Sequence, residues 1–504
     1  MSIRTAQWLC GTALVVGLLG DQLLRSEPWG VGAALWLILS IGTALVVART
    51  TRAAGGAALM ALLLAAGGFA ACLAWRDAPT LKGWNVLATG AALTLGLLAV
   101  GNVRLRVASL AEYVTGVARA ALWAAVGPIV LVGRDLIGRE RAAGGASPRL
   151  RALVVGIVIT IPILILFGAL LTSADPVFDR LTRFLIVWDF EQLLSHLLLI
   201  GFLSWMAAGY LRSVVTPSAA LTRPVAEVPR PGWDALAVGI PLGALALLFL
   251  AFIVVQARYL FGGEDLIRTT VGLTYAEYAR RGFFELVAVA GLVLPLLMAA
   301  EWVLGASDRF TVRVYRGLAA TILVLVGCII ASAAMRLRLY HDAYGLTHDR
   351  LYAAAVMVWI ASALAWFGAT VLRGQRHRFV FGAVMAGLAV VAGMNVLDPD
   401  VVIARANLAH AARGHELDTS YLTRLSADAT ATLAAALPAL STAERCAIGR
   451  HLAQEERRRR ESDWRSWSLS RSRADGAVRE IDVVGAGCPT SDPPDAATEP
   501  APGI

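Results

Sequence analysis

The sequence predicts an all-α, polytopic membrane protein, and three observations support this fold class. Hydrophobic residues make up 58% of the 504 residues and charged residues only 16%, whereas soluble chains average about 25% charged residues. Mean hydropathy is +0.66, and the apolar residues gather in stretches long enough to cross a bilayer as helices. The C-terminal region instead alternates apolar and polar residues at helical spacing. We therefore expect a transmembrane helix bundle followed by a small soluble helical region.

Eleven apolar stretches are expected to span the membrane. They run over Gln7–Leu23, Val31–Ala48, Ala53–Trp75, Trp84–Val100, Ala152–Leu171, Leu193–Leu211, Leu236–Val255, Phe283–Leu304, Gly317–Ala334, Leu351–Leu372 and Phe379–Val396. Asp21 lies near the end of the first stretch, but no clear small-residue cleavage site follows it. We therefore interpret this stretch as a span rather than as a signal peptide.

The distribution of arginine predicts the orientation of the bundle. The segment from Arg104 to Arg151 holds eight arginines and three acidic residues, and loops of this kind stay in the cytoplasm. Counting spans from this loop puts the N-terminus in the cytoplasm and the C-terminus outside. Within the loop, Val107–Ile137 is expected to lie on the inner surface as an amphipathic helix.

These observations give the expected organisation of the chain. Residues 1–101 hold four spans, 102–151 form the basic cytoplasmic loop, 152–397 hold seven spans with polar outer loops, 398–484 form an extracytoplasmic helical tail, and 485–504 are disordered.

The tail differs from the rest of the chain in charge. From Asp398 onward it holds 13 arginines and 16 acidic residues, so the net charge of +9 arises in the membrane part and reflects orientation rather than binding to nucleic acid. Helices are expected over Val401–Ala412, Asp418–Leu437 and Thr442–Arg460. The run Glu455–Arg460 is either a solvated helix face or a patch for an acidic partner.

The five cysteines fall into two groups. Cys10, Cys72 and Cys328 lie in predicted spans, where packing accounts for them. Cys446 and Cys488 lie in the tail and are the candidate pair for a disulfide in an oxidising compartment, the alternative being two free thiols. Because no zinc-type cysteine spacing occurs, we expect no metal and no cofactor.

Three polar segments follow predicted spans and face the same side as the tail. They run over 173–180, 258–285 and 336–350. The candidate polar site consists of Asp175, Asp179, Tyr275, Tyr278, Arg280, Arg281, Glu285, Arg336, Tyr340, Asp342 and Tyr344. Glu285 is the strongest member, because it lies about one turn inside a span, where Arg281 can pair with it. The alternative is interfacial structure, with tyrosines at headgroup depth and arginines reaching out of the bilayer.

Signatures of catalysis are missing from these segments. His341, Asp342, His348 and Asp349 are zinc ligands by type, but Gly345 predicts a turn between them and the spacing fits no known zinc site. The sequence contains no nucleophile elbow, phosphate loop or dinucleotide motif. No residue is assigned a catalytic role, and whether the chain is an enzyme stays open.

Five segments form a recognisable set between about Ala152 and Ala474. They are Leu171–Phe178, Thr274–Leu286, Leu339–Thr347, Asn395–Asn407 and Asp463–Trp467, and they include the strings SADPVF, TYAEYARRGFFEL and DAYGLT. The set resembles a bacterial family of uncharacterised polytopic membrane proteins that is defined only as a domain of unknown function. The resemblance implies a membrane protein and no particular activity.

Three classes of function are compatible with these features. The first, which we favour, is a non-enzymatic scaffold, regulator or envelope-assembly factor whose outer loops and tail bind an extracytoplasmic protein or a lipid-linked partner. Loops packed against the tail would support it. The second is a permease, which an open cavity lined by Glu285 and Arg336 would support. The third is an integral-membrane enzyme acting on a lipid-linked substrate, which a lipid-facing groove holding Asp175 and Asp342 would support.

Overall fold

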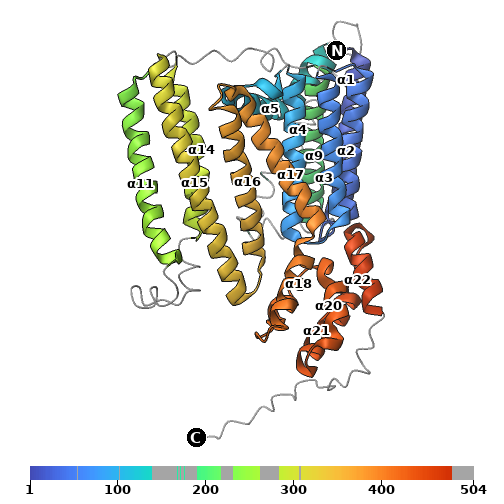
Figure 1. The fold of residues 1–504 in the computed structure, drawn as a ribbon. Helices are drawn as coiled ribbons and strands as arrows, with labels where there is room; N and C mark the ends of the chain where they lie inside the picture. The colour runs from blue at the N-terminus through green and yellow to red at the C-terminus, as the bar shows by residue number, and fades with distance from the viewer. Residues whose placement is uncertain are drawn as a thin grey trace.

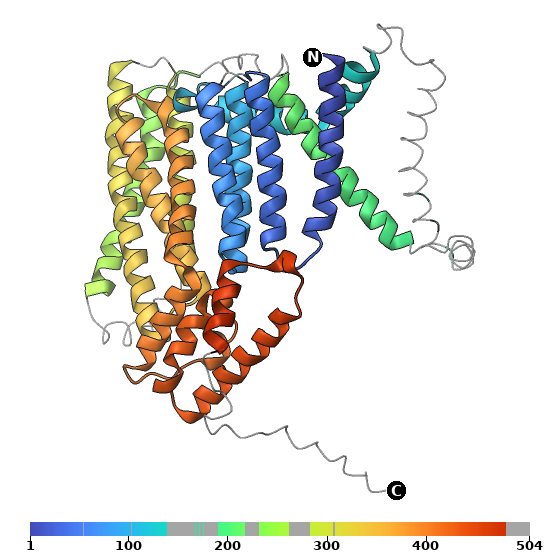
Figure 2. The same ribbon diagram turned by 90° about the vertical axis from the view of Figure 1, so that its right-hand side faces the viewer.

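The computed structural model describes residues 1–53, 55–101, 103–138, 190–216, 231–261, 283–305 and 308–479, together with Phe167, Leu171 and Asp175. Every regular element within these residues is a helix, as the sequence predicts. Residues up to 397 form a bundle of long helices, and residues 398–479, which we call the tail, lie against one end of it (Figure 1). A view from the side shows the N-terminus at the opposite end of the bundle (Figure 2).

The first half of the bundle packs five helices around one apolar core. They are α1 (Ile3–Leu24), α2 (Val31–Thr50), α3 (Gly56–Trp75), α4 (Pro79–Val100) and α9 (Phe190–Val215). After α4 come η1 (Leu105–Val107), α5 (Leu110–Val130) and the π-helical η2 (Leu131–Gly138). Ala66, Ala70 and Ala92 are fully buried in this core, so the backbones of neighbouring helices approach closely, as is usual in membranes.

The second half has its own core. It contains α11 (Ala235–Phe261), α14 (Phe283–Leu304), α15 (Arg309–Tyr344), α16 (His348–Thr370), η3 (Arg376–Arg378) and α17 (Phe379–Leu397). The buried Tyr315 donates its hydroxyl to the carbonyl of Leu297 at 3.0 Å, which ties α15 to α14. Val380 packs against both cores. α17 therefore joins the two halves.

Eleven helices within the described residues are long and apolar enough to cross a membrane. Ten of them coincide with predicted spans, although α15 continues to Tyr344, well beyond the predicted end at Ala334. Its 36 residues correspond to about 54 Å, which exceeds the thickness of a hydrocarbon core. The predicted fifth span, 152–171, lies outside the described residues apart from Phe167 and Leu171. By the length and composition of its helices, the chain is a membrane protein.

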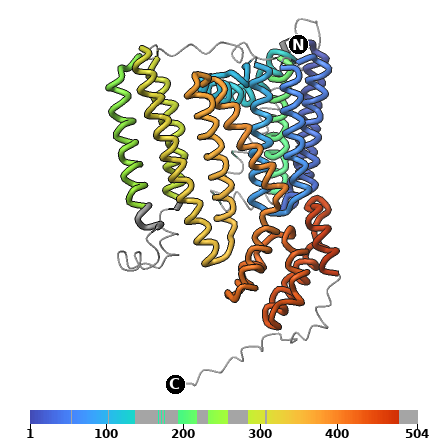
Figure 3. Tube along the Cα trace, viewed as in Figure 1, coloured from blue at the N-terminus to red at the C-terminus, as the bar shows by residue number. Residues whose placement is uncertain are grey.

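The one helix of these eleven that matches no predicted span is Leu110–Leu136. The sequence predicts that it lies on the membrane surface. Its trace lies across the end of the bundle where the N-terminus lies (Figure 3). Gly116 packs against Leu98 near the end of α4, and Asp135 pairs with Arg212 near the end of α9 at 2.9 Å. Because both contacts are with helix ends, α5 runs along one end of the bundle. Its position relative to a membrane stays a prediction.

Ionisable side chains within the bundle have partners. Asp21 is 1% exposed, Arg25 donates to it from Nε at 2.8 Å, and Nδ1 of His196 lies 2.5 Å from its other oxygen. Near the opposite end, Arg376 pairs with Glu301 at 2.9 Å. A buried charge is tolerated when it is paired. These contacts explain how an aspartate is accommodated near the end of the first span.

The tail is a small helical unit with a core of its own. Its helices are α18 (Pro399–Ala411), α19 (Thr419–Leu422), α20 (Ala427–Ala436), η4 (Leu437–Ala439), α21 (Thr442–Arg460), η5 (Trp464–Ser466) and α22 (Leu469–Arg479). Ile448, Leu422 and Ala429 are among its fully buried residues. The single helix expected over Asp418–Leu437 is divided into α19 and α20, because Ser426 caps α20 and donates its backbone N–H to Asp400 at 2.7 Å.

Candidate functional site

Three loops at one end of the bundle hold the tail. They connect α1 to α2, α3 to α4, and α15 to α16, and each makes hydrogen bonds with residues that follow Leu397. The tail lies directly against this end in both ribbon views (Figure 1, Figure 2). We take this interface as the candidate functional site, because buried charges are concentrated in it.

Asp428, at the start of α20, caps the bundle helix α4. The N-cap of α4 is Ala78, which has no side chain able to accept a hydrogen bond. Oδ2 of Asp428 accepts from the backbone N–H groups of Asp77 at 2.7 Å and Ala78 at 2.9 Å, and the hydroxyl of Ser470 contacts its other oxygen. A carboxylate is favourable beside a helix N-terminus because of the helix dipole. The tail thus supplies a cap that the sequence around α4 lacks.

Arg76 joins Asp428 to the last turn of α17. Its guanidinium pairs with Asp398 and lies 3.6 Å from Oδ1 of Asp428. Nε of Arg76 donates to the carbonyl of Asn395 at 2.8 Å. Arg76 is 7% exposed and Asp398 9%. Such pairs stabilise a structure only when the remaining hydrogen bonds are also satisfied, and Asp428 meets this condition.

Lys82, the only lysine of the chain, belongs to the same cluster. Its Nζ lies 2.7 Å from Oδ1 of Asp77, and Nε of Arg471 lies 3.0 Å from the same oxygen. Burial alone would raise the pKa of Asp77, but Lys82 and Arg471 together hold it below its ordinary value. We call the following residues the clamp cluster: Arg76, Asp77, Lys82, Asp398, Asp428, Ser470 and Arg471.

Below the clamp cluster, an amide pair continues the polar contact into the bundle. Asn85 of α4 and Asn395 of α17 are fully buried and donate to each other at 2.9 and 2.7 Å. Nδ2 of Asn395 also donates to the carbonyl of Val391 at 2.9 Å. This reciprocal pair fixes the register between a helix of the first half and a helix of the second half.

The loop between α15 and α16 meets the tail at Asn407. Oδ1 of Asn407 accepts from the backbone N–H of Leu346 at 2.7 Å, and Nδ2 donates to the carbonyl of the same residue at 2.8 Å. Gly345 has φ +74°, and a Cβ added there would lie 2.4 Å from Oδ1 of Asn407. Both the backbone angle and the close approach therefore require glycine at this turn.

Next to this turn, His348 connects two parts of the tail. Its Nε2 lies 2.8 Å from Oδ1 of the fully buried Asp400, and its Nδ1 lies 3.0 Å from the hydroxyl of Tyr421. Burial opposes ionisation, but the hydrogen bonds from His348 and Ser426 hold the pKa of Asp400 below its ordinary value. A carboxylate, an imidazole and a phenol in a row can relay a proton.

The third contact is made by η5 and the loop between α1 and α2. The backbone N–H of Val31 donates to the carbonyl of Trp467 at 2.7 Å, and Arg465 contacts the carbonyl of Gln22. A Cβ at Gly30 would lie 2.4 Å from the carbonyl oxygen of Trp467. The close approach of η5 to this loop thus depends on a glycine in the loop.

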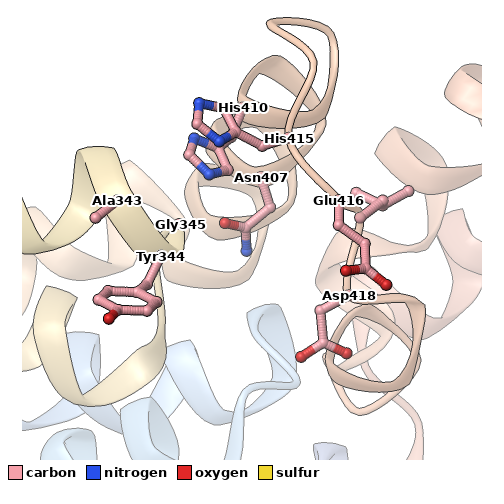
Figure 4. A pocket seen from close by; sticks show the side chains of 9 residues that line it. Ala343, Tyr344, Gly345, Asn407, His410, His415, Glu416 and Asp418 are labelled. Carbon is pink, nitrogen blue, oxygen red and sulfur yellow. The ribbon is translucent and has the colours of Figure 1, made fainter.

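A pocket of about 310 Å³ opens beside this interface (Figure 4). The rings of His410 and His415 stack with centroids 3.9 Å apart on one side, and Glu416 and Asp418 lie on the other. Burial and the stacked His415 lower the pKa of His410. Within the described residues, no group of three or more histidine, cysteine or acidic side chains is arranged to hold a metal ion. The two sides of the pocket thus do not form a metal centre.

The structure brings together only part of the site that the sequence predicts. Tyr340 and Tyr344 pack edge to face with ring centroids 5.2 Å apart, and the guanidinium of Arg350 lies 3.7 Å from the ring centroid of Tyr340. Stacking of this kind stabilises the end of α15. It agrees with the alternative of interfacial structure at these tyrosines.

The other predicted site residues lie apart or outside the described residues. Glu285, Asp342 and Asp175 are exposed, and Arg336 is buried in α15. Outside the described residues lie Asp179, Tyr275, Tyr278, Arg280, Arg281 and Cys488. The pairing of Glu285 with Arg281 therefore stays a prediction, as does the disulfide between Cys488 and the buried Cys446.

Sequence reasoning did not identify the clamp cluster, although three signals pointed to it. Lys82 is a single lysine among 45 basic residues and lies at the start of a span. Arg76 and Asp77 are adjacent charges directly after a span. Asp398 and Asp400 flank a proline within one of the five recognised segments. The sequence does not reveal that residues 76–82 contact the tail.

Replacing Asp428 with asparagine should release the tail from the bundle. An asparagine oxygen can still accept from the two backbone N–H groups, but the amide NH2 then faces Ser470 and Arg76. We expect this mismatch to cost about 1–3 kcal/mol. We expect faster hydrogen exchange in residues 469–479, with unchanged exchange in α11 and α14, for which no extensive contact with the tail is found among the described residues. Asp418→Asn is the matched control, because Asp418 caps α19 within the tail. Equal protection of 469–479 in both variants would contradict this role of Asp428.

Docking of the tail should also depend on pH through Asp398. Burial and the neighbouring carboxylates of Asp428 and Asp400 raise the pKa of Asp398 to about 6, against the opposing effect of Arg76. A carboxyl whose folded pKa is raised stabilises the folded state at low pH, and this contribution is lost as pH rises from about 4 through 6. Protection of 469–479 should therefore fall between about pH 4 and 6, and Asp398→Asn should remove this fall. A fall of the same size in the variant would show that another group is responsible.

Comparison with known proteins finds one family whose model covers most of the bundle and part of the tail. A family model for a domain of unknown function (DUF4153) matches residues 63–436, from within α3 to the end of α20. The match starts earlier than the resemblance expected from Ala152 onward, and it includes the clamp cluster except Ser470 and Arg471. No match to a curated protein or to a solved structure was found. Because this family model matches most of the chain, the protein belongs to the family defined by DUF4153.

Proposed function

We propose that this protein is a non-enzymatic scaffold or regulator of the bacterial cell envelope, which presents its tail and outer loops as one preassembled surface to a partner. The observation that carries the proposal is the clamp cluster, whose three cations and three carboxylates hold the tail against the bundle. A tail that only tethered a partner would not need buried charges at its base. The partner is an extracytoplasmic protein or a lipid-linked molecule.

Sidedness is part of this proposal. The end of the bundle opposite the tail carries Arg49 and Arg52 after α2, the basic start of α15, and the basic turn at η3. Short basic loops face the cytoplasm. This pattern supports a cytoplasmic N-terminus and an extracytoplasmic tail in the inner membrane.

An enzyme acting on a lipid-linked substrate is the second candidate, and one observation favours it. Asp400, His348 and Tyr421 form a carboxylate–imidazole–phenol row. His348→Asn and Tyr421→Phe separate the two candidates when the tail stays docked. A scaffold with these substitutions still complements a deletion strain, whereas an enzyme that uses the row loses function.

Site-specific photo-crosslinking in native membranes tests the scaffold proposal. A photoreactive residue replaces Arg413, exposed just after α18, or, as a matched control, Arg52, exposed at the other end of the bundle. We expect one discrete product from position 413 only, and its loss at equal abundance when Asp428→Asn is added. A product that persists after this substitution, or none specific to position 413, would count against a preassembled surface.

A further inference from the structure

A second pocket, of about 230 Å³, lies where the tail meets the loop between α3 and α4. Its wall is formed by the segment between α19 and α20, by α20 itself, by one face of α21, and by the start of α22. The ionisable residues of the wall are Asp77, Arg424, His451, Glu455, Arg459 and Arg471. Three arginines therefore face two carboxylates.

Both carboxylates of this wall already have cationic partners. Asp77 is paired with Lys82 at 2.7 Å and Arg471 at 3.0 Å. Glu455 is paired with Arg458 at 2.9 Å. With Asp475, the partner of Arg459, also counted, five cations stand against three carboxylates among the wall residues and their partners. Its interior therefore attracts an anion.

Arg459 gives the second, independent indication of a ligand. Its side chain is 8% exposed, and Nε pairs with Asp475 of α22 at 2.7 Å. Its Nη2 is buried and has no hydrogen-bond partner among the described residues. Buried guanidinium N–H groups are rarely left without an acceptor. An acceptor from outside the chain would give Nη2 of Arg459 the hydrogen-bond partner that it lacks.

Arg424 belongs to a different wall segment from Arg459. Whereas Arg459 lies on α21, Arg424 lies between α19 and α20, and its side chain is exposed. Its guanidinium lies 5.7 Å from the ring centroid of Tyr421, and Nε donates to the carbonyl of Ser420 at 3.2 Å. These contacts hold the head group while leaving it open to solvent. A guanidinium held in this way presents paired N–H donors that match phosphate oxygens.

We propose that this pocket binds a phosphate-bearing anion, with Arg424 and Arg459 as its principal donors. The pocket volume accommodates a phosphate or pyrophosphate group. The ligand is either the headgroup of an anionic lipid or a soluble phosphate compound, because the two present the same oxygens. The pocket shares Asp77 and Arg471 with the clamp cluster, but binding of an anion by Arg424 and Arg459 does not require a partner, so either proposal can fail without the other.

The test uses the full-length protein in lipid nanodiscs and measures hydrogen exchange of residues 422–430 and 451–460. Inorganic pyrophosphate is titrated in phosphatidylcholine discs against sodium chloride of equal ionic strength. Phosphatidylglycerol discs without added phosphate form the second arm. Arg424→Gln and Arg459→Gln are compared with Arg457→Gln, an exposed arginine of α21 that does not line the pocket.

Saturable protection by pyrophosphate identifies a soluble ligand, and protection in phosphatidylglycerol discs alone identifies a lipid. In either case, Arg424→Gln and Arg459→Gln should each weaken the apparent affinity about tenfold or more, since each removes a charge-assisted hydrogen bond. Arg424→Gln keeps the test valid if loss of the Arg459–Asp475 pair disturbs the tail. Absence of protection in both arms, or an equal loss in Arg457→Gln, overturns the proposal.

Discussion

The contact between the Asp428 carboxylate and the start of α4 is the interaction on which the tail end of this protein depends. α4 begins at Pro79 without a capping side chain of its own, and a residue 350 positions further along the chain takes that role. The donors around Asp428 come from both the bundle and the tail. The helix is therefore completed only when the tail is in place, and the buried carboxylate is satisfied only at that position.

The same contact couples the two halves of the bundle. Arg76 and Asn85 belong to the first half, whereas Asn395 and Asp398 belong to α17 and its last turn in the second half. The loop before α16 binds the tail through Asn407 and Asp400. A change at the tail thus alters contacts in both halves at once. This arrangement suits a protein that transmits or holds a conformation better than one that only anchors a soluble domain.

Features that depend on local sequence could be predicted, and those that depend on distant contacts could not. Ten spans follow from apolar length alone, and the capping box at Ser441 and Glu444 marks the start of α21. The clamp cluster needs Asp428 beside Ala78, which no periodicity encodes. Glu285 is the strongest predicted member of the polar site because it lies about one turn inside a predicted span. In the structure its side chain is exposed. The break at Ser426 likewise depends on Asp400, a residue of another helix.

Distance measurement between the tail and the bundle tests the central claim most directly. Spin labels are attached to cysteines at Thr80, exposed at the start of α4, and at Arg450, exposed on α21, with all five native cysteines replaced by alanine. A docked tail predicts one narrow distance distribution in nanodiscs, which broadens when Arg76→Gln is added. A broad distribution in the protein with an intact clamp cluster would contradict the account.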